Sequence, residues 1–331
     1  MKKLISIMMV AFLALGLAAC SNDDKPTSNP DPETTKQSIV VMTPNATHGF
    51  TGQSVSDAQA GTKELAEQYN LDYKVVTSAN ATEQASQIEQ IVAENPSIVV
   101  LWPHDNTLKS AAQTLVDAGI PVVIYDRLLE DFDQVSEVMG DNVKIGEETG
   151  LYFNNYFADE IADASVEAIY YVEFKGDNSS VPQQRSDGFH STIDDKFVSL
   201  GEWSTDWQSA KGQSLMEEFM TTPEFEKLDA IFTHDAEVAL GVLSALEGYT
   251  GEHKVRLVSA ISEPKQLLDK IQHYSDLGID VVTYTFNPNM VVDAVELAIK
   301  HLNGETAAPL HLIPTEAIDV NNYTEFTGWG Q

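Results

Sequence analysis

The sequence has a single cysteine among its 331 residues, Cys20, so no disulfide can form within the chain. Stability must therefore come from the packing of apolar side chains, which make up 43% of the residues. A chain of this length can bury the cores of two lobes.

Basic residues are scarce as well. The chain has 19 lysines and arginines against 51 aspartates and glutamates, which gives a formal net charge of −32. Such a charge repels nucleic acid and anionic lipid. We therefore expect no nucleic-acid partner, and no membrane contact through the protein surface itself. The charge also favours a neutral ligand over an anionic one.

A long hydrophobic run is missing too, because the apolar stretch over residues 4–19 is short for a membrane span. With a basic start before it and small residues after it, this stretch predicts an export signal over residues 1–19. The segment Leu17–Cys20 resembles the lipobox of bacterial lipoproteins, in which the cysteine becomes the lipidated first residue. A plain secretory signal with a chance cysteine is the alternative.

The stretch after the signal, residues 20–37, is dominated by Ser, Asn, Asp, Pro and Thr. It offers almost nothing apolar to bury, so we expect a flexible tether. The protein is then expected to be exported and anchored to a membrane by the lipid on Cys20, on the cell-envelope or periplasmic side.

Patterns for catalysis, metal binding and phosphate binding are absent from the sequence. The eight histidines show no metal-ligand spacing, and Gly49 with Gly52 indicates only a turn. The neighbouring acids Glu147–Glu148 and Asp194–Asp195 would point apart on a helix and form no catalytic pair. We expect no catalytic residue, no metal, no cofactor and no enzymatic activity.

The chain does contain a regular alternation of short apolar runs with amphipathic segments, which is typical of parallel α/β sheets. The alternation restarts around Gly140–Asn142, without a linker rich in glycine or proline, which indicates two α/β lobes that share several crossings. Asn80 and Glu83 predict a capping box. The predicted strands cover residues 38–42, 71–76, 97–101, 120–125, 166–172, 197–200, 228–233, 255–259, 279–284 and 310–313. The predicted helices cover residues 53–69, 80–94, 108–118, 143–157, 185–193, 208–220, 238–246, 265–274 and 288–302.

One predicted strand ends in an acid and a base. Residues 120–125 are a continuous apolar run, typical of a strand buried on both faces, and Asp126 and Arg127 follow at once. Such a strand has no room for a charge until it leaves the sheet, and ligands bind at this edge of open α/β sheets. We predict that Asp126 and Arg127 lie in a binding site. An ion pair that pins a loop is the alternative.

Together with Tyr125–Arg127, four further segments are notable for their order and spacing: Asp141–Asn142, Arg185–Phe189, Asp206–Trp207 and Leu228–Asp235. In this order they resemble the periplasmic sugar-binding proteins of the ribose, xylose and galactose group, which are solute receptors of ABC importers. The resemblance implies an α/β fold of two Rossmann-like lobes with parallel sheets, joined by three hinge crossings. The lobes would comprise residues 38–141 plus 287–312, and residues 142–286 plus 313–331.

The resemblance also implies the main ligand contacts. Asp126 and Arg127 would bind sugar hydroxyls from the first lobe, Arg185 would bind from the second, and Trp207 would stack on the ring. Charged planar groups form strong bidentate hydrogen bonds with hydroxyls, and an indole face covers the apolar C–H face of a sugar.

Other ligand contacts are predicted from the surrounding loops. His234 stands where relatives often carry asparagine. His48, Phe50 and Trp102 lie on loops expected near the ligand, although a surface or capping role fits the histidines equally well. Asn287 belongs to the segment before the hinge proline, where relatives place glutamine or lysine.

Three departures from the family pattern concern the ligand. The first loop, over residues 44–52, differs from the asparagine-rich aromatic loop of ribose binders. No acid follows the strand over residues 255–259, where the chain continues Ala260–Ser262, and Phe286 and Asn287 replace the usual polar residue before Pro288. Asp235 matches an acid of the family and is expected to cap the next helix.

The resemblance implies a monomer that captures a small neutral sugar, a pentose or a hexose, and delivers it to the membrane subunits of an ABC permease. A second hypothesis is a signal receptor for an autoinducer-type sugar derivative, which would report to a membrane sensor. An exported glycan-active enzyme is a third and less favoured hypothesis.

Overall fold

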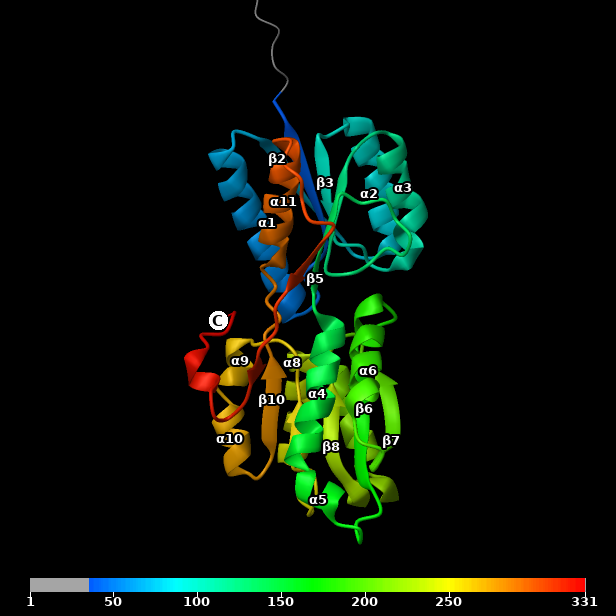
Figure 1. Ribbon diagram of the computed structural model, residues 1–331, viewed down its shortest axis with the longest axis vertical. Coiled ribbons are helices and arrows are strands. Elements are labelled where there is room, and N and C mark those ends of the chain that lie inside the picture. The colour runs from blue at the N-terminus through cyan, green and yellow to red at the C-terminus, as the bar shows by residue number, and fades with distance from the viewer. Residues whose placement is uncertain (1–35, 331) are drawn as a thin grey trace, which may run out of the picture. The chain divides into compact units, whose positions relative to one another are not determined.

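The structure is a computed structural model that describes residues 36–330. The expected export signal over residues 1–19, the expected lipidation site Cys20 and the tether up to residue 35 lie outside the described residues. From Lys36 onward the chain forms one unit that contains two six-stranded sheets (Figure 1).

The first sheet has the strand order β11-β5-β4-β3-β1-β2, and every neighbouring pair is parallel. Helices α1 and α11 pack together on one side of it, and α2 and α3 on the other (Figure 1). We call this sheet and these helices the first lobe. Its strands are β1 (Ser38–Pro44), β2 (Asp72–Ser78), β3 (Ile98–Leu101), β4 (Val122–Tyr125), β5 (Ser136–Gly140) and β11 (Leu310–Ile313). Its helices are α1 (Gly49–Gln68), α2 (Ala81–Glu94), η1 (Asn106–Leu108), α3 (Lys109–Asp117) and α11 (Met290–Leu302).

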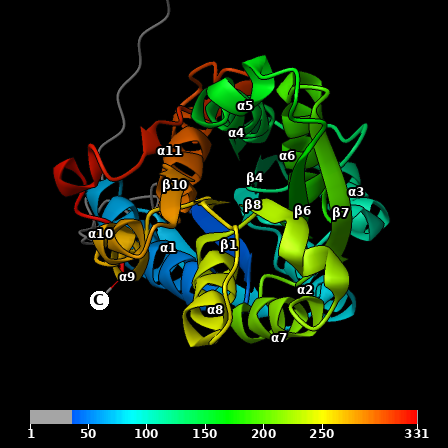
Figure 2. The same cartoon turned by 90° about the horizontal axis from the view of Figure 1, so that it is seen from below.

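The second sheet has the order β12-β10-β9-β8-β6-β7 and is parallel except for the pair β10 and β12. Helix α4 packs on α6, and α7 packs on α8 (Figure 2). This sheet and its helices are the second lobe. Its strands are β6 (Ile169–Lys175), β7 (Phe197–Ser204), β8 (Leu228–Thr233), β9 (Leu257–Ser259), β10 (Asp280–Tyr284) and β12 (Ala317–Ile318). Its helices are α4 (Asn142–Tyr156), α5 (Ala158–Ala162), α6 (Ser180–Thr192), α7 (Ser209–Phe219), η2 (Pro223–Lys227), α8 (Ala236–Gly248), α9 (Lys265–Leu268), α10 (Ile271–Asp276) and η3 (Tyr323–Glu325).

The chain passes between the lobes three times, after β5, after β10, and between β11 and β12. The fold is therefore an α/β fold of two Rossmann-like lobes joined by three crossings, and the predicted fold class is confirmed. Within residues 36–330, no helix is long and apolar enough to cross a membrane.

The central strands are apolar on both faces because helices cover both sides of each sheet. All four residues of β4 are buried, which confirms the buried strand expected over this stretch. Its consecutive residues enter different cores: Val122 packs in the core that contains Val99, and Val123 in the core that contains Val100. This is the period of two that the strand geometry requires.

Helices α4 and α6 approach so closely that only glycine fits at their contact. A Cβ atom on Gly146 would lie 2.2 Å from the carbonyl oxygen of Arg185, and one on Gly188 would lie 2.2 Å from that of Val143. Replacing either glycine would push the helices apart. The close approach places Arg185 of α6 beside the first residue of α4.

Some predicted elements need correction. The sequence does not predict β5, whose serine, glutamate and terminal glycine leave only two apolar residues in the strand, nor the two-residue β12. The helix predicted over 265–274 is two short helices, and at the break the N–H of Lys270 donates to the carbonyl of Leu267, three residues earlier, rather than four as in an α-helix. Strand β6 begins at Ile169 rather than at residue 166, because a turn from Asp163 to Val166 precedes it.

The capping box predicted for α2 is half right. The Asn80 side chain accepts a hydrogen bond from the N–H of Glu83 at 2.9 Å. The Glu83 side chain does not return the bond to Asn80. It accepts instead from the N–H of Ala79 at 2.6 Å, because the extended backbone before the cap brings that donor into reach.

Candidate ligand-binding site

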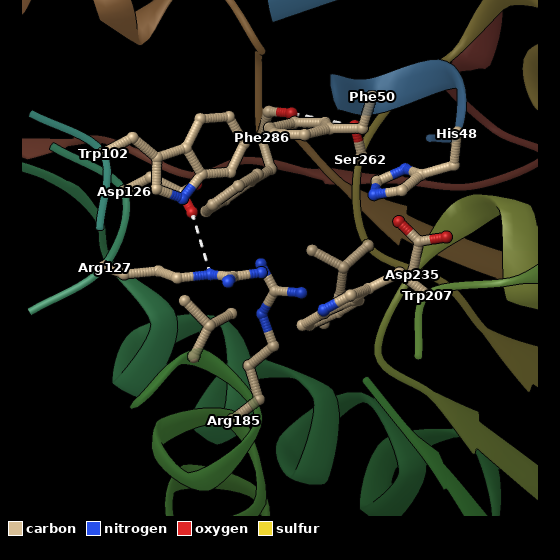
Figure 3. A pocket seen from close by; sticks show the side chains of 12 residues that line it. His48, Phe50, Trp102, Asp126, Arg127, Arg185, Trp207, Asp235, Ser262 and Phe286 are labelled. Carbon is tan, nitrogen blue, oxygen red and sulfur yellow. Dashed lines mark hydrogen bonds and ion pairs between the residues drawn. The ribbon is translucent and has the colours of Figure 1, made fainter. Parts of the chain in front are cut away.

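A pocket lies between the lobes, at the carboxyl ends of strands from both sheets (Figure 3). Its cavity has a volume of about 30 Å³, which is room for about two water molecules. A larger ligand therefore requires the lobes to move apart. The pocket is lined by His48, Phe50, Trp102, Asp126, Arg127, Val181, Arg185, Trp207, Asp235, Ile261, Ser262 and Phe286.

The Asp126 carboxylate lies directly after β4 and is buried, with 5% of the residue exposed. The Nε atom of Arg127 lies 3.8 Å from its Oδ2, beyond hydrogen-bond distance, and no hydrogen bond among residues 36–330 ends on this carboxylate. Burial raises the pKa of Asp126 to about 6, although the charges of Arg127 and Arg185 act to lower it. Buried polar groups normally have partners, so this carboxylate is open to donors from a ligand.

The Arg127 guanidinium is held in place by His104 and Asp177 rather than by its sequence neighbour Asp126. Its Nη1 donates to the carbonyl oxygen of His104, and its Nη2 lies 2.9 Å from Oδ2 of Asp177, which follows β6 in the second lobe. Burial alone would raise the pKa of Asp177, but the charge of Arg127 and a hydrogen bond from the N–H of Ser179 at 2.9 Å hold it below its ordinary value. Only Nε of Arg127 has no partner among the described residues.

Arg185 reaches the pocket from α6 and is 3% exposed. Its Nε donates to Oδ1 of Asn142 at 2.9 Å, its Nη1 donates to the carbonyl oxygen of His234, and its guanidinium lies 4.6 Å from the ring centroid of Phe286. Burial lowers the pKa of Arg185 to about 10, so the group is charged at neutral pH. These contacts fix its direction and leave Nη2 without a partner among residues 36–330.

Aromatic rings from both lobes form much of the pocket wall. In the second lobe, the Trp207 ring lies over Gly176, where an added Cβ atom would come within 2.1 Å of the indole. In the first lobe, Trp102 and Phe50 meet edge to face at 6.1 Å, and the Trp102 Nε1 is buried without a partner among the described residues. Such rings suit a ligand with flat apolar faces.

Unfavourable backbone conformations are concentrated at this pocket. Seven non-glycine residues have a positive φ among those that the structure describes, and three of them line the pocket: Asp126 at 67°, Trp207 at 62° and Ser262 at 90°. Each such residue costs on the order of 1–3 kcal/mol and persists where its surroundings hold it, most often at functional sites. The strain supports a binding role for this pocket.

Three bonds join the lobes around the pocket. Besides the pair of Arg127 and Asp177, the N–H of Leu128 donates to Oγ of Ser180 at 3.3 Å. The N–H of Phe50 donates to Oε1 of Glu237 at 3.0 Å. The last bond requires glycine before Phe50, because a Cβ atom on Gly49 would lie 2.4 Å from the Glu237 oxygen.

The structure brings most of the predicted ligand residues together, but not His234 and Asn287. Asn287 is half-buried outside the pocket, and its Oδ1 accepts from the N–H of Asn289. The chain turns there so that Phe286, one residue earlier, lines the pocket. In the same way, Asp235 lines the pocket and its neighbour His234 does not. The Oδ1 atom of Asp235 also caps α8, because it accepts hydrogen bonds from two backbone N–H groups.

The structure does not place the His234 side chain in the pocket, where the sequence predicts it, because this side chain points back into the second lobe. It is fully buried, with Nε2 2.9 Å from Oε1 of Glu173, which also accepts from the Ser186 hydroxyl. Burial opposes the charge on Glu173, yet the bonds from His234 and Ser186 hold its pKa below the ordinary value. Burial lowers the pKa of His234 despite Glu173. We therefore treat the contact as a neutral imidazole that donates to a carboxylate behind Arg185.

The sequence analysis did not assign five of the lining residues to the ligand. Besides Asp235, these are Val181, Ile261, Ser262 and Phe286. Ile261, Ser262 and Phe286 follow β9 and β10. Ligands bind where the strands of open α/β sheets end, so the argument that selects Asp126 would also have selected these residues. Their mostly apolar character concealed them.

In the described part of the chain, no group of three His, Cys, Asp or Glu side chains is placed to hold a metal ion.

The fold and the pocket define a two-lobed binding protein with its site between the lobes. A family model described as the periplasmic binding protein domain matches residues 39–306, and the chain belongs to this family. This confirms the resemblance inferred from the sequence.

Relatives of known function are similar over most of their length. The chain is 26% identical over 249 residues to the ribose import binding protein of Bacillus subtilis, covering 74% of this chain and 77% of the relative. It is 25% identical over 271 residues to the D-xylose-binding periplasmic protein of Haemophilus influenzae, covering 76% and 78%. The Caulobacter myo-inositol binding protein bound to myo-inositol has a similar fold, with a TM-score of 0.76, 19% identity and coverage of 90% and 98%.

Proposed function

We propose that the protein is a monomeric solute receptor of an ABC transporter and binds a small neutral sugar between its lobes. The observation that carries the proposal is the buried Asp126 carboxylate, short of donors, beside two guanidinium groups and between aromatic rings. Sugar hydroxyls can donate to the carboxylate and accept from a guanidinium, while the C–H faces pack on the rings. Two acids and two arginines at the pocket offset each other, which favours a neutral ligand. The ribose and D-xylose named for two relatives agree with this.

A thermal-shift screen of neutral pentoses, hexoses and polyols, followed by titration calorimetry, tests the proposal. A cognate sugar at a hundred times its Kd should stabilise the fold by about 2.7 kcal/mol. Mass spectrometry of the ligand released from denatured protein should recover it chemically unchanged. Failure of every sugar to bind would contradict the proposal, and a chemically altered ligand would favour the glycan-active enzyme.

The mechanism that we propose is hinge closure. The cavity of about 30 Å³ requires the lobes to open for a sugar, and the three interlobe bonds can form only when they approach. The lobe boundaries at residues 38–141 plus 287–312 and residues 142–286 plus 313–331 are part of this proposal.

Trp207→Ala is expected to weaken both sugar binding and closure, because one ring face loses its apolar cover. The loss of buried area corresponds to about 1–3 kcal/mol of binding free energy. Small-angle scattering, with and without saturating sugar, should show compaction of the wild type and less compaction of the variant. Trp203→Ala is the matched control, since Trp203 lies on β7 outside this pocket. A wild type that does not compact on binding would refute closure.

Sugar affinity is expected to fall as the pH is lowered through 6. Burial raises the pKa of both Asp126 and Asp235 to about 6, and hydroxyl donors bind the ionised forms, so protonation of the free site competes with the sugar. By linkage, each group that must ionise weakens binding about tenfold between pH 7.5 and 5. Calorimetry at both pH values checks this, and Asp126→Asn should flatten the dependence. A constant affinity over this range would show that neither carboxylate binds the sugar in its ionised form.

Lipid anchoring through Cys20 is part of the proposed localisation outside the cytoplasmic membrane. Cys20→Ala should give a folded, sugar-binding protein that carries no acyl chains and leaves the membrane fraction. Mass spectrometry of the mature N-terminus and membrane fractionation measure this. A variant that keeps its acyl chains would refute the lipoprotein assignment and leave sugar binding untouched.

A further inference from the structure

One stretch of the pocket wall offers mostly carbon to a ligand. It consists of Ile261, Ser262 and Phe286, which follow β9 and β10, and we call it the carbon edge. Ile261 and Phe286 have apolar side chains. The Ser262 hydroxyl is already used twice, because it donates to the Phe286 carbonyl oxygen at 2.8 Å and accepts from Trp329 Nε1 at 2.9 Å.

Five of the six backbone N–H and C=O groups of the carbon edge have a hydrogen-bond partner, and the Ile261 N–H has none among residues 36–330. The Ile261 carbonyl accepts from the N–H of Ala236 at 2.9 Å, and the Ser262 N–H donates to the Tyr284 carbonyl at 2.9 Å. The Ser262 carbonyl accepts from the Thr283 hydroxyl. The Phe286 N–H donates to the Glu263 side chain at 2.7 Å. A hydroxyl pressed against the Ile261 and Phe286 side chains would therefore meet carbon, and all but one of the polar groups around it already have partners.

The carbon edge has little freedom to rearrange around a ligand. The Phe286 ring lies against Gly140, where an added Cβ atom would come within 2.0 Å of it, and against the Arg185 guanidinium at 4.6 Å. Phe50 packs on the same ring at 5.5 Å. Close packing on three sides keeps the ring in place.

Free polar groups lie elsewhere in the same pocket. The Asp126 carboxylate, Nε of Arg127 and Nε1 of Trp102 have no hydrogen-bond partner among residues 36–330. Oδ2 of Asp235 is free in the same part of the chain, because both cap bonds end on Oδ1. The pocket can therefore satisfy several hydroxyls, but not one that is directed at the Ile261 and Phe286 side chains.

We propose that the ligand is a deoxy sugar, which directs a methyl group or a CH₂ carbon, and no hydroxyl, at Ile261 and Phe286. The inference rests on the proposed sugar-binding function and narrows it. A hydroxylated sugar in the same pose would bury a hydroxyl without a partner, and should bind roughly tenfold to a hundredfold more weakly.

Titration calorimetry of the purified protein with matched pairs of sugars tests the inference. Suitable pairs are D-galactose with 6-deoxy-D-galactose, D-glucose with 6-deoxy-D-glucose, L-mannose with L-rhamnose, and D-ribose with 5-deoxy-D-ribose and 2-deoxy-D-ribose. In the pair that binds most tightly, the deoxy member should have a Kd at least tenfold lower. If the hydroxylated member binds equally or more tightly, the inference is overturned while sugar binding stands. If no member of any pair binds, the proposed function fails and the inference fails with it.

A variant can reverse the preference. Phe286→Gln adds an amide to the carbon edge and should lower the ratio of the two Kd values at least fivefold in favour of the hydroxylated sugar. Ile261→Asn adds an amide at the neighbouring position and serves as the test if Phe286→Gln lowers Tm too far to bind. Val198→Asn, at an exposed position on β7 outside the pocket, is the control and should leave the ratio unchanged. An unchanged ratio in a folded carbon-edge variant would also overturn the inference.

Discussion

Asp126→Ala is expected to weaken sugar binding by roughly tenfold to more than a hundredfold, because each hydrogen bond to a charged group contributes about 1.5–3 kcal/mol. The carboxylate is buried, has no donor among the described residues, and lies beside Arg127. No other group in the pocket could replace it, because the remaining free carboxylate oxygen belongs to Asp235 after a different strand. Titration calorimetry with the cognate sugar measures the loss.

The same substitution should leave the fold nearly as stable as before. Burial raises the pKa of Asp126 to about 6, so the charged form still predominates at neutral pH but is less favourable in the folded protein than in the unfolded chain, and the carboxylate contributes little to the stability of the fold. Asp126→Asn is the better matched control for backbone strain, because asparagine tolerates the φ of 67° at this position. It should also lose affinity while keeping Tm. A large drop in Tm with unaltered affinity would identify Asp126 as a structural residue that pins the loop.

Glu173→Ala is expected to lower the free energy of unfolding by about 2–6 kcal/mol, because two buried donors would each lose a partner at about 1–3 kcal/mol. These donors are Nε2 of His234 and the hydroxyl of Ser186, and Glu173 itself is 1% exposed. Urea unfolding followed by circular dichroism measures the loss. Sugar affinity is a second readout, because the His234 carbonyl holds Arg185.

Glu202→Ala is the control for this variant, because the two glutamates are register partners on neighbouring strands. Glu202 is on β7 opposite Glu173, and its side chain is 63% exposed in an ion pair with Lys175 at 2.8 Å. Removing an exposed pair of this kind costs at most about 1 kcal/mol. Equal losses in the two variants would mean that the bonds behind Arg185 do not stabilise the second lobe.

Local sequence patterns are sufficient to predict the class of fold and one side of the candidate site. Strand and helix periods depend on local spacing, so the α/β alternation and the buried strand β4 could be predicted from apolar patterns alone. The position of Asp126 and Arg127 at a strand end followed from the same rule, because a doubly covered strand excludes charge until it leaves the sheet. Asp235 as a helix cap is also local, since its bonds span only three residues.

Only the tertiary structure decided which residue of each loop lines the pocket. Loop directions depend on packing rather than on periodicity, so Phe286 replaced Asn287 and Asp235 replaced His234. The His234 side chain points into the second lobe because it pairs with Glu173 on β6, and the sequence around His234 does not reveal this distant partner. Strand β5 needed its neighbours β4 and β11 for stability, since it has few apolar residues of its own. The carbon edge exists because residues distant in the sequence form hydrogen bonds with most of the polar groups of Ile261, Ser262 and Phe286. These bonds form only when the chain is folded.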